Sequence, residues 1–198
     1  MPTYSSSLST VVINSLGGST VGWGYSTPPP QYSSGSLSTG QYTSYVCFYS
    51  FGLSVPLTES IVGVQVTYGT QGQPDTSQVG CDKSVVLTYN ASTPASGCTD
   101  HATGTSYSNI SITSQNRGGA SDMWGLALTP TIVNGSNFGF MVSCKSSGIA
   151  GPIDFLMSSV GTITVTTTIN GGPVGGGSIS HELSTGMQIF PSSPLVVI

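Results

Sequence analysis

Charged side chains are scarce in this sequence. Its 198 residues include three Lys or Arg and seven Asp or Glu residues, together 5% of the chain, whereas an ordinary soluble domain carries about 25%. Histidine occurs twice. Enzymes gather acids, bases or metal ligands at one place, and this chain has few residues from which to build such a site. We therefore expect a protein that is not an enzyme and that needs no cofactor or metal.

Basic residues and long apolar runs are also missing. Lys83, Arg117 and Lys145 are spread along the chain, whereas a nucleic-acid site needs several cations that face the phosphates together. No apolar run reaches the length of about 18 residues that a membrane span requires. The first residues lack the basic and apolar stretches of a signal peptide. We expect no nucleic-acid partner, no membrane partner, and a chain made in a cytosol or present as a mature form.

Four cysteines occur, and none of them forms a C-x-x-C pair, so a zinc or redox motif is not expected. Two disulfides fit the sequence. Cys81 and Cys98 lie in turn-rich segments that flank one predicted strand, and Cys47 and Cys144 lie in apolar runs that could meet across a core. The alternative is that all four are buried free thiols, which pack as small apolar side chains. The sequence leaves both possibilities open.

What the sequence does contain is a β pattern. Runs rich in Val, Ile, Thr, Tyr and Phe are separated by clusters of Gly, Pro, Asn and Ser. In residues 61–68 and 160–169, apolar and polar side chains alternate, which puts one row on a buried face and the other in solvent. We predict an all-β chain that forms a single, jelly-roll-like β-sandwich with an extended C-terminal arm. The predicted strands are residues 8–13, 43–53, 61–68, 84–89, 107–113, 124–128, 137–144, 153–157 and 160–169.

The composition divides the chain into four parts. Residues 1–19 are an N-terminal strand or segment, and residues 20–170 are the sandwich, within which residues 20–42 are expected to form a long loop. Residues 171–177, with the sequence GGPVGGG, form a linker. Residues 178–198 form an arm that we expect to dock on a neighbouring subunit, and the alternative is that it folds back on its own sandwich. Its apolar residues, the candidate contacts, are Ile189, Phe190, Leu195, Val196, Val197 and Ile198.

A few polar residues suggest chemistry, but a simpler interpretation suits each better. Asp100 precedes His101 in a Ser- and Thr-rich stretch, where a solvated loop pair is more common than a catalytic one. Asp75 and Asp82 flank one Gly- and Gln-rich stretch, and we interpret them as loop acids rather than calcium ligands. Tyr25, Tyr32, Tyr42 and Tyr45 could present a sugar-binding face, although core packing or contacts between subunits explain them equally well.

The most specific stretch is residues 118–130, GGASDMWGLALTP, followed by residues 132–140, IVNGSNFGF. It resembles a β-sandwich module of virion structural proteins in tailed bacteriophages and prophages. The order of the module is kept upstream in GWGY at 22–25 and in FGLSVP at 51–56. The match covers about residues 20–170, whereas the cysteine-bearing loops and residues 171–198 lie outside it.

The resemblance implies a structural protein with no catalytic residues to carry over. The motif also has a physical interpretation. Asp122 caps a turn, and Trp124, followed by Gly125, anchors the core. Asn137 suits a tight turn, and Gly139 permits close packing of strands.

Together these observations predict a capsid decoration, or cement, protein of a bacteriophage. Such a protein is made in the host cytoplasm, resides in the virion, and forms a homo-oligomer that contacts the major capsid protein or other virion proteins. The alternative is a tail, neck or fibre component that binds glycans on the host surface.

Overall fold

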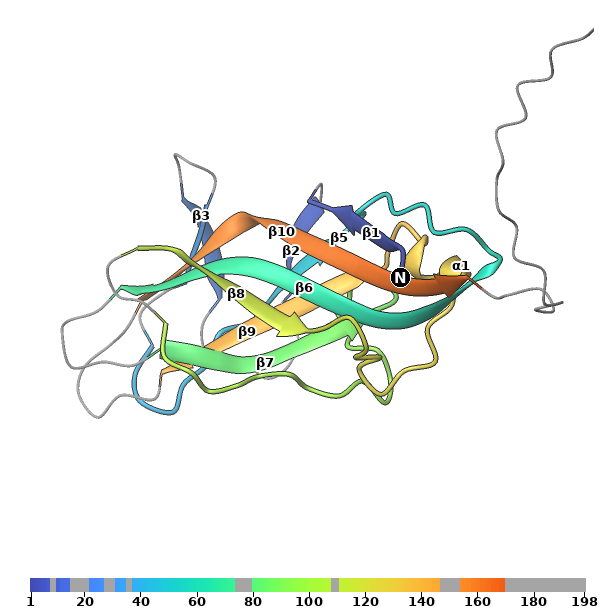
Figure 1. Ribbon diagram of the computed structural model, residues 1–198. Helices are drawn as coiled ribbons and strands as arrows, with labels where there is room; N and C mark the ends of the chain where they lie inside the picture. Colours follow the sequence, from blue (N-terminus) through green and yellow to red (C-terminus); the bar gives the residue numbers. More distant parts are fainter. Residues whose placement is uncertain are drawn as a thin grey trace, which may run out of the picture.

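The chain forms two antiparallel sheets that pack face to face, which confirms the predicted all-β sandwich (Figure 1). The computed structural model describes residues 1–7, 10–14, 22–26, 31–34, 37–73, 80–107, 111–146 and 154–169. The first sheet contains β1 (Thr3–Ser6), β3 (Trp23–Ser26), β4 (Gln31–Ser34), β6 (Glu59–Gln73), β8 (Thr113–Gly118) and β10 (Asp154–Ile169). The second sheet contains β2 (Thr10–Asn14), β5 (Tyr45–Tyr49), β7 (Gly80–Thr88) and β9 (Gly139–Ser146). The short helix α1 (Pro130–Val133) precedes β9.

The order of the strands is that of a jelly roll. The order β1-β10-β6-β8 in the first sheet faces β5-β9-β7 in the second. Residues 95–107 run along the outer edge of β7, in the place of an eighth strand. Most connections cross from one sheet to the other, as the two Greek keys of a jelly roll require. The strand β2 extends the second sheet beyond β5, and the hairpin β3–β4 extends the first beyond β10.

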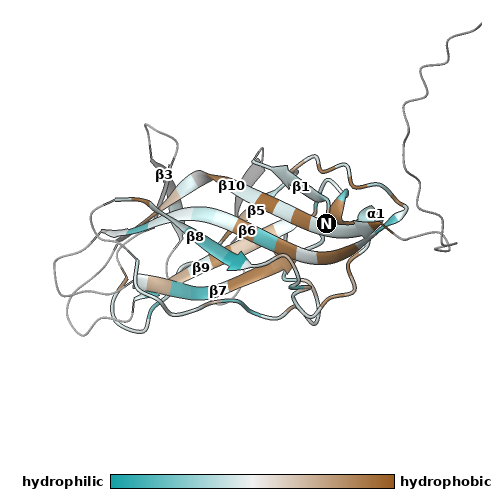
Figure 2. Cartoon of the chain, in the orientation of Figure 1, coloured by the Kyte–Doolittle hydropathy of each residue, from teal (hydrophilic) through white to brown (hydrophobic). Residues whose placement is uncertain are grey.

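The long pair of β6 and β10 shows why the sequence folds in this way. Val64 pairs with Val165 and Val66 with Ile163, and all four side chains are buried between the sheets. The residues between them are polar and lie on the outer face, so hydrophilic and hydrophobic positions alternate along both strands (Figure 2). Burying one apolar row on each strand supplies most of the driving force for this pairing.

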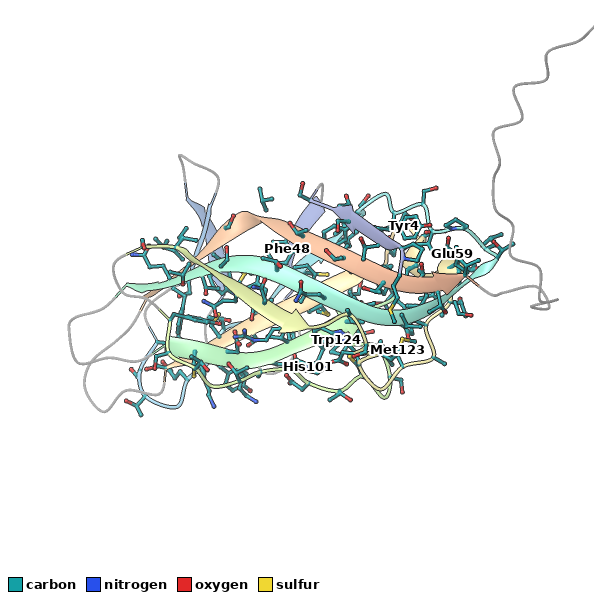
Figure 3. The ribbon with its side chains drawn as sticks, in the orientation of Figure 1. Tyr4, Phe48, Glu59, His101, Met123 and Trp124 are labelled. Carbon is teal, nitrogen blue, oxygen red and sulfur yellow. The ribbon has the colours of Figure 1, made fainter. Side chains whose placement is uncertain are left out.

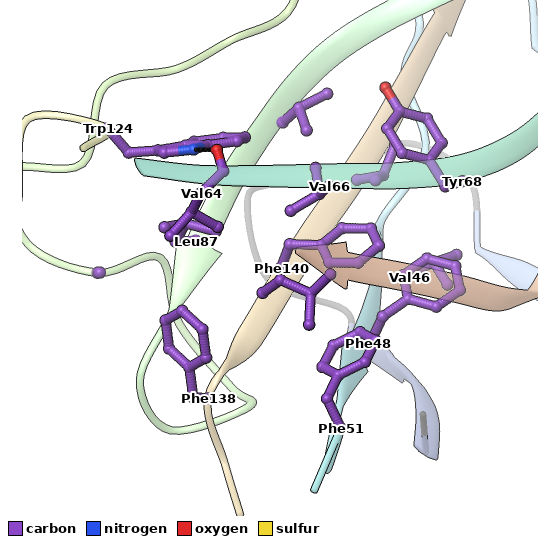
Figure 4. Close-up of a cluster of buried hydrophobic side chains, with 14 of the residues drawn as sticks. Val46, Phe48, Phe51, Val64, Val66, Tyr68, Leu87, Trp124, Phe138 and Phe140 are labelled. Carbon is purple, nitrogen blue, oxygen red and sulfur yellow. Dashed lines mark hydrogen bonds between the residues drawn. The ribbon is translucent and has the colours of Figure 1, made fainter. Parts of the chain in front are cut away.

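Aromatic rings fill the space between the sheets. Phe48 on β5 stacks on Phe140 on β9, with 4.7 Å between the ring centroids, and Phe51 stacks on the same ring at 5.9 Å (Figure 4). Gly161 lies opposite them at a bulge in β10, where a Cβ atom would lie 2.7 Å from Phe140 and 2.8 Å from Phe48. The bulge glycine therefore makes room for the two rings.

Several predicted strands differ from the observed ones. The two strands predicted at residues 153–157 and 160–169 are one strand, β10, which begins at Asp154, because a bulge between Met157 and Gly161 bends it without breaking the ladder. Residues 20–42 were expected to form a loop, but they contain the hairpin β3–β4. Its strands are too short for alternation to be recognised in the sequence.

Two further predictions of strands were wrong. Residues 124–128 form a turn, because Trp124 and Gly125 have φ angles of 55° and 70°, which no strand accommodates. In the strand predicted at residues 107–113, the buried Tyr107 and residues 111–112 are irregular, β8 begins only at Thr113, and residues 108–110 lie outside the described part of the chain. Tertiary contacts override the β propensity of both segments.

Candidate interaction surfaces and the motif beneath them

The segment that carries the family resemblance forms a turn that is bound to β6. Trp124 and Gly125 are consecutive left-handed residues, and this conformation is unfavourable for a bulky side chain. Asp122 stabilises it, because its Oδ1 atom accepts a hydrogen bond of 2.8 Å from the Trp124 N–H. Val64 on β6 donates to the Asp122 carbonyl at 2.9 Å and accepts from the Gly119 N–H at 3.1 Å. The turn is thus fixed on both sides.

The Trp124 indole anchors this turn in the core. The side chain is fully buried, and its Nε1 atom donates a hydrogen bond of 2.8 Å to the Val64 carbonyl (Figure 4). Gly118, with a φ angle of 72°, passes directly over the ring, and a Cβ atom there would lie 2.6 Å from Nε1. The indole therefore occupies a slot that glycine leaves open.

The second half of the motif positions the start of β9. The Asn134 side chain accepts from the Val55 N–H and donates to the Val55 carbonyl, both at 2.8 Å. Asn137 lies exposed in the turn after α1. Gly139 begins β9 where a Cβ atom would lie 1.9 Å from the Phe48 carbonyl oxygen. Asn134 and Gly139 thus hold neighbouring backbones close together.

Residues 95–107 close the outer edge of β7. The Leu87 N–H donates to Cys98 Sγ at 3.2 Å, and the Val85 N–H donates to Asp100 Oδ1 at 2.9 Å. The Val85 carbonyl accepts from the His101 N–H at 2.9 Å. An exposed edge strand invites pairing with another chain, and here side chains and backbone together satisfy this part of the edge.

His101 faces Asp122 rather than its neighbour in sequence, Asp100. Its Nε2 atom lies 3.2 Å from Asp122 Oδ2, and its ring packs edge-on against Trp124 with 4.2 Å between centroids (Figure 3). Asp100 instead accepts from the backbone N–H groups of Val85 and Ala102. The structure therefore separates the Asp100–His101 pair that the sequence suggested. The carboxylate that His101 meets belongs to the motif turn.

The four cysteines are free thiols. Cys47 lies on the outer face of the second sheet, and Cys144 lies in the core between the sheets, so they cannot reach the Cβ separation of about 4 Å that a disulfide needs. Cys98 contacts Leu87, which is six residues along β7 from Cys81, or about 20 Å in a strand. Neither pairing that fitted the sequence is present.

Burial favours the protonated form of two of the thiols, Cys47 and Cys98. Burial raises the pKa of Cys47 to about 12, and burial also raises the pKa of the half-buried Cys98. Both are therefore protonated at neutral pH, and a protonated thiol is a poor nucleophile and a poor metal ligand. No group of three His, Cys, Asp or Glu side chains within the described residues is arranged to hold a metal ion.

A charged pair that the sequence did not reveal joins the two sheets. Asp82 on β7 accepts hydrogen bonds from Arg117 on β8, through Nε at 2.8 Å and also through Nη2. Its other oxygen accepts from the hydroxyls of Tyr68, at 2.7 Å, and Tyr107. Asp82 and Arg117 are 1% and 8% exposed, so the interpretation of Asp82 as a loop acid was wrong. The hint in the sequence was a lone arginine on the inward-facing row of β8.

The two tyrosines of this network predict a loss of stability in alkaline solution. Burial, and then the charge of Asp82, raises the pKa of Tyr68, and burial raises the pKa of Tyr107 well above its ordinary value. Above about pH 10 the unfolded chain loses these protons while the folded chain keeps them, so the free energy of unfolding falls by about 1.4 kcal/mol per pH unit for each tyrosine. Urea unfolding between about pH 9 and about pH 11 measures this slope.

The variant Tyr107→Phe tests this assignment. It removes one of the protons, so the alkaline slope should become smaller by about 1.4 kcal/mol per pH unit. A general loss of stability would lower the free energy of unfolding equally at every pH, so the slope of its plot against pH would not change. An unchanged slope in the variant would therefore contradict the role of Tyr107.

The described acidic residues make contacts within the protein, whether they are buried, as Asp82 is, or exposed, as Asp100 is. Each of the four carboxylates whose side chains the structure describes contacts a protein group: Asp82, Asp100 and Asp122 as above, and Glu59 through the hydroxyls of Tyr4, at 2.8 Å, and Thr167. Lys83 lies 5.6 Å from the centre of the Tyr42 ring. These contacts fix the positions of the described acidic side chains, whose number the composition already keeps small.

The outer face of the first sheet is a neutral polar surface. Ser5 on β1 and Thr164 on β10 share a hydrogen bond of 2.8 Å, and Thr67 on β6 donates to Asn116 on β8 at 2.7 Å. Thr162 on β10 lies directly opposite Thr67 on β6. Hydroxyl and amide groups thus cover the centre of this sheet.

The outer face of the second sheet is apolar and aromatic. Cys47, Val86 and Met141 form a buried row on it, and the half-buried Tyr45 and Tyr49 pack against that row. Tyr25 and Tyr32 pair with each other in the β3–β4 hairpin of the other sheet. The four tyrosines proposed as one sugar-binding face are therefore divided between the two sheets.

Comparison with known proteins gives no assignment: no family model, no curated protein and no solved structure matches this chain. Among the described residues, no helix is long and apolar enough to cross a bilayer. The predicted linker, residues 171–177, and the predicted arm, residues 178–198, lie outside the described residues.

Proposed function

We propose that this protein is a structural component of a bacteriophage virion, and specifically a capsid decoration protein that stabilises the shell. The observation that carries the proposal is the neutral outer face of the first sheet, above a sandwich whose described carboxylates all have internal partners. A surface with so little charge repels its own copies weakly. It suits a protein that packs in many copies against neighbours. The sequence resemblance at residues 118–140 supports the same class.

The proposed mechanism is packing rather than chemistry. Each copy contributes apolar and hydrogen-bonded contact area to the major capsid protein or to another copy of itself. A modest interface gains strength when it is repeated around a closed shell. The sandwich suits this task, because its buried pair of Asp82 and Arg117 ties one sheet to the other.

A second candidate function is a tail, neck or fibre component that binds host glycans. The aromatic outer face of the second sheet favours it, because sugar rings pack on tyrosine rings. Tyr45 and Tyr49 lie on this face, and Tyr89, which is 39% exposed, stacks on Phe138 nearby. Binding of the isolated protein to host surface polysaccharide, lost in Tyr49→Ala and kept in Tyr42→Ala, would favour this candidate.

The number of copies in a virion tests the proposal. Quantitative mass spectrometry of purified particles should find on the order of hundreds of copies for a decoration protein, because such a protein follows the capsid lattice. Tens of copies or fewer would place the protein in the neck, tail or fibre. If the chain is absent from purified particles, both candidates fail.

The neutral surface also predicts how attachment responds to salt. Raising NaCl from about 0.15 M to about 1 M shortens the Debye length from about 8 Å to about 3 Å, which weakens ion pairs but leaves apolar and neutral hydrogen-bonded contacts in place. The fraction of protein that stays on the particle should change by less than about twofold. Sedimentation of washed particles measures it, and release by salt would contradict the proposal.

A charge placed on the outer face of the first sheet tests whether this face contacts the particle. Thr162→Lys, at the centre of the outer face of the first sheet, should weaken attachment by about tenfold, since a lysine buried without a partner is unfavourable. Ser136→Lys adds the same charge at an exposed turn beyond this face and should attach normally. Equal attachment of the two variants would exclude this face as the contact.

A further inference from the structure

A groove opens at the end of the sandwich where α1 lies. It has a volume of about 450 Å³, within the range of sites that hold small ligands or short peptide segments. Leu57 at the groove is 74% exposed. The groove is lined by Leu57, Glu59, Ser60, Ile61, Leu128, Thr129, Pro130 and Thr131. An exposed leucine beside further apolar groups marks a surface that burial by another apolar segment would stabilise.

The last described strand ends beside this groove. Ile169, the final residue of β10, pairs in register with Glu59, which lines the groove. Figure 1 shows this end of β10 next to α1. Ile169 is itself 71% exposed. The described part of the chain therefore ends at the edge of the groove.

Residues 170–198 include an apolar stretch that suits the groove. Residues 195–198 are Leu-Val-Val-Ile, they follow a proline, and no charged residue occurs after Glu182. Four consecutive aliphatic residues are unfavourable in water. Leu57 offers exposed aliphatic surface at the groove, with smaller contributions from the mostly buried Ile61 and Leu128, beside the hydroxyls of Ser60, Thr129 and Thr131. The one ionisable lining residue, Glu59, is already engaged by the hydroxyls of Tyr4 and Thr167.

We infer that in the free protein this groove is filled by residues 195–198 of the same chain. The intervening residues 170–194 are rich in Gly and Ser, and Gly- and Ser-rich linkers of that length have a root-mean-square span of about 28 Å. A segment tethered in this way experiences an effective concentration of about millimolar, far above that of a second copy in a micromolar solution. The tether therefore favours the chain's own segment. This inference does not depend on the proposed role in a virion.

Photo-crosslinking of the full chain tests the inference. With p-benzoylphenylalanine in place of Leu57, irradiation of a micromolar solution should join position 57 to residues 187–198, and the product should run as a monomer on a denaturing gel. The matched control is the same replacement at Val160, which is also exposed, at 54%. It lies nine residues before Ile169 on β10, or about 30 Å away. Its yield of crosslinks to residues 187–198 should be roughly tenfold lower.

Changes within the segment separate specific docking from chance contact. The double change Leu195→Asp and Val197→Asp should reduce the crosslink from position 57 about tenfold, because charged side chains resist burial against aliphatic walls. Ser192→Asp with Ser193→Asp adds the same charge in the same segment and should leave the crosslink unchanged. Equal yields from positions 57 and 160, or a crosslink that survives the 195 and 197 changes, would overturn the inference. A crosslinked dimer would overturn it too, and would support the docking on a neighbouring subunit that the sequence suggested.

Discussion

Replacing Asp82 by Asn should lower the free energy of unfolding by about 3–5 kcal/mol, the typical effect of removing one member of a buried ion pair. The side chain is 1% exposed, and it accepts hydrogen bonds from Arg117, Tyr68 and Tyr107. Asparagine has nearly the same shape but no charge, so the guanidinium of Arg117 would remain buried without its counter-ion. Guanidinium chloride unfolding, followed by circular dichroism, measures the difference.

Two controls isolate the ion pair as the cause. Asp100→Asn changes a carboxylate that is exposed and bonds only to backbone N–H groups, so it should cost less than about 1 kcal/mol. The double variant Asp82→Leu with Arg117→Met removes both charges, and it should be more stable than Asp82→Asn, since no charge stays unpaired. If Asp82→Asn proves no more harmful than Asp100→Asn, the pair does not have the structural role described above.

Trp124→Ala should be the most damaging change within the motif, with a loss of about 3–5 kcal/mol. The indole is fully buried, and its removal leaves a cavity between the motif turn and β6. The Val64 carbonyl would lose its donor as well. The left-handed turn at Trp124 would then lack the packing that offsets its strain.

The expected effect is local as well as global. The Val64 N–H bonds to the Asp122 carbonyl, so its hydrogen exchange should become much faster in Trp124→Ala than in the parent chain. Met123→Ala is the matched control, because Met123 adjoins Trp124 but is partly exposed, and it should cost about 1 kcal/mol. Equal effects of the two changes would show that Trp124 is not the anchor of the turn.

The alternating rows of β6 and β10 allowed the sandwich to be predicted. In those strands a period of two over eight or more residues admits one structure, with one face buried and the other in water. The same rule failed for residues 124–128, because the contacts that hold Trp124 in a left-handed turn come from Val64 and Gly118, outside the segment. It also failed for the β3–β4 hairpin, whose strands have four residues each.

For the candidate surfaces too, the sequence predicted some properties and missed others. Composition showed that charge is scarce, and from that alone a neutral surface follows. It could not show that Asp82 would meet Arg117, which is 35 residues away in the sequence. Nor could it show that Asp122 rather than Asp100 would face His101. Partners of this kind are brought together by strand order and register, which no local pattern encodes.

By itself, then, the sequence determined that this is an all-β protein with few charges, because alternation and composition are properties of short segments and of the whole chain. The tertiary structure alone decided which sheet each strand joins, that the four thiols form no disulfide, and which group of the protein each described carboxylate contacts. It also placed the end of β10 beside the groove at Leu57. These outcomes depend on long-range packing, whose energy is shared among residues far apart in the chain.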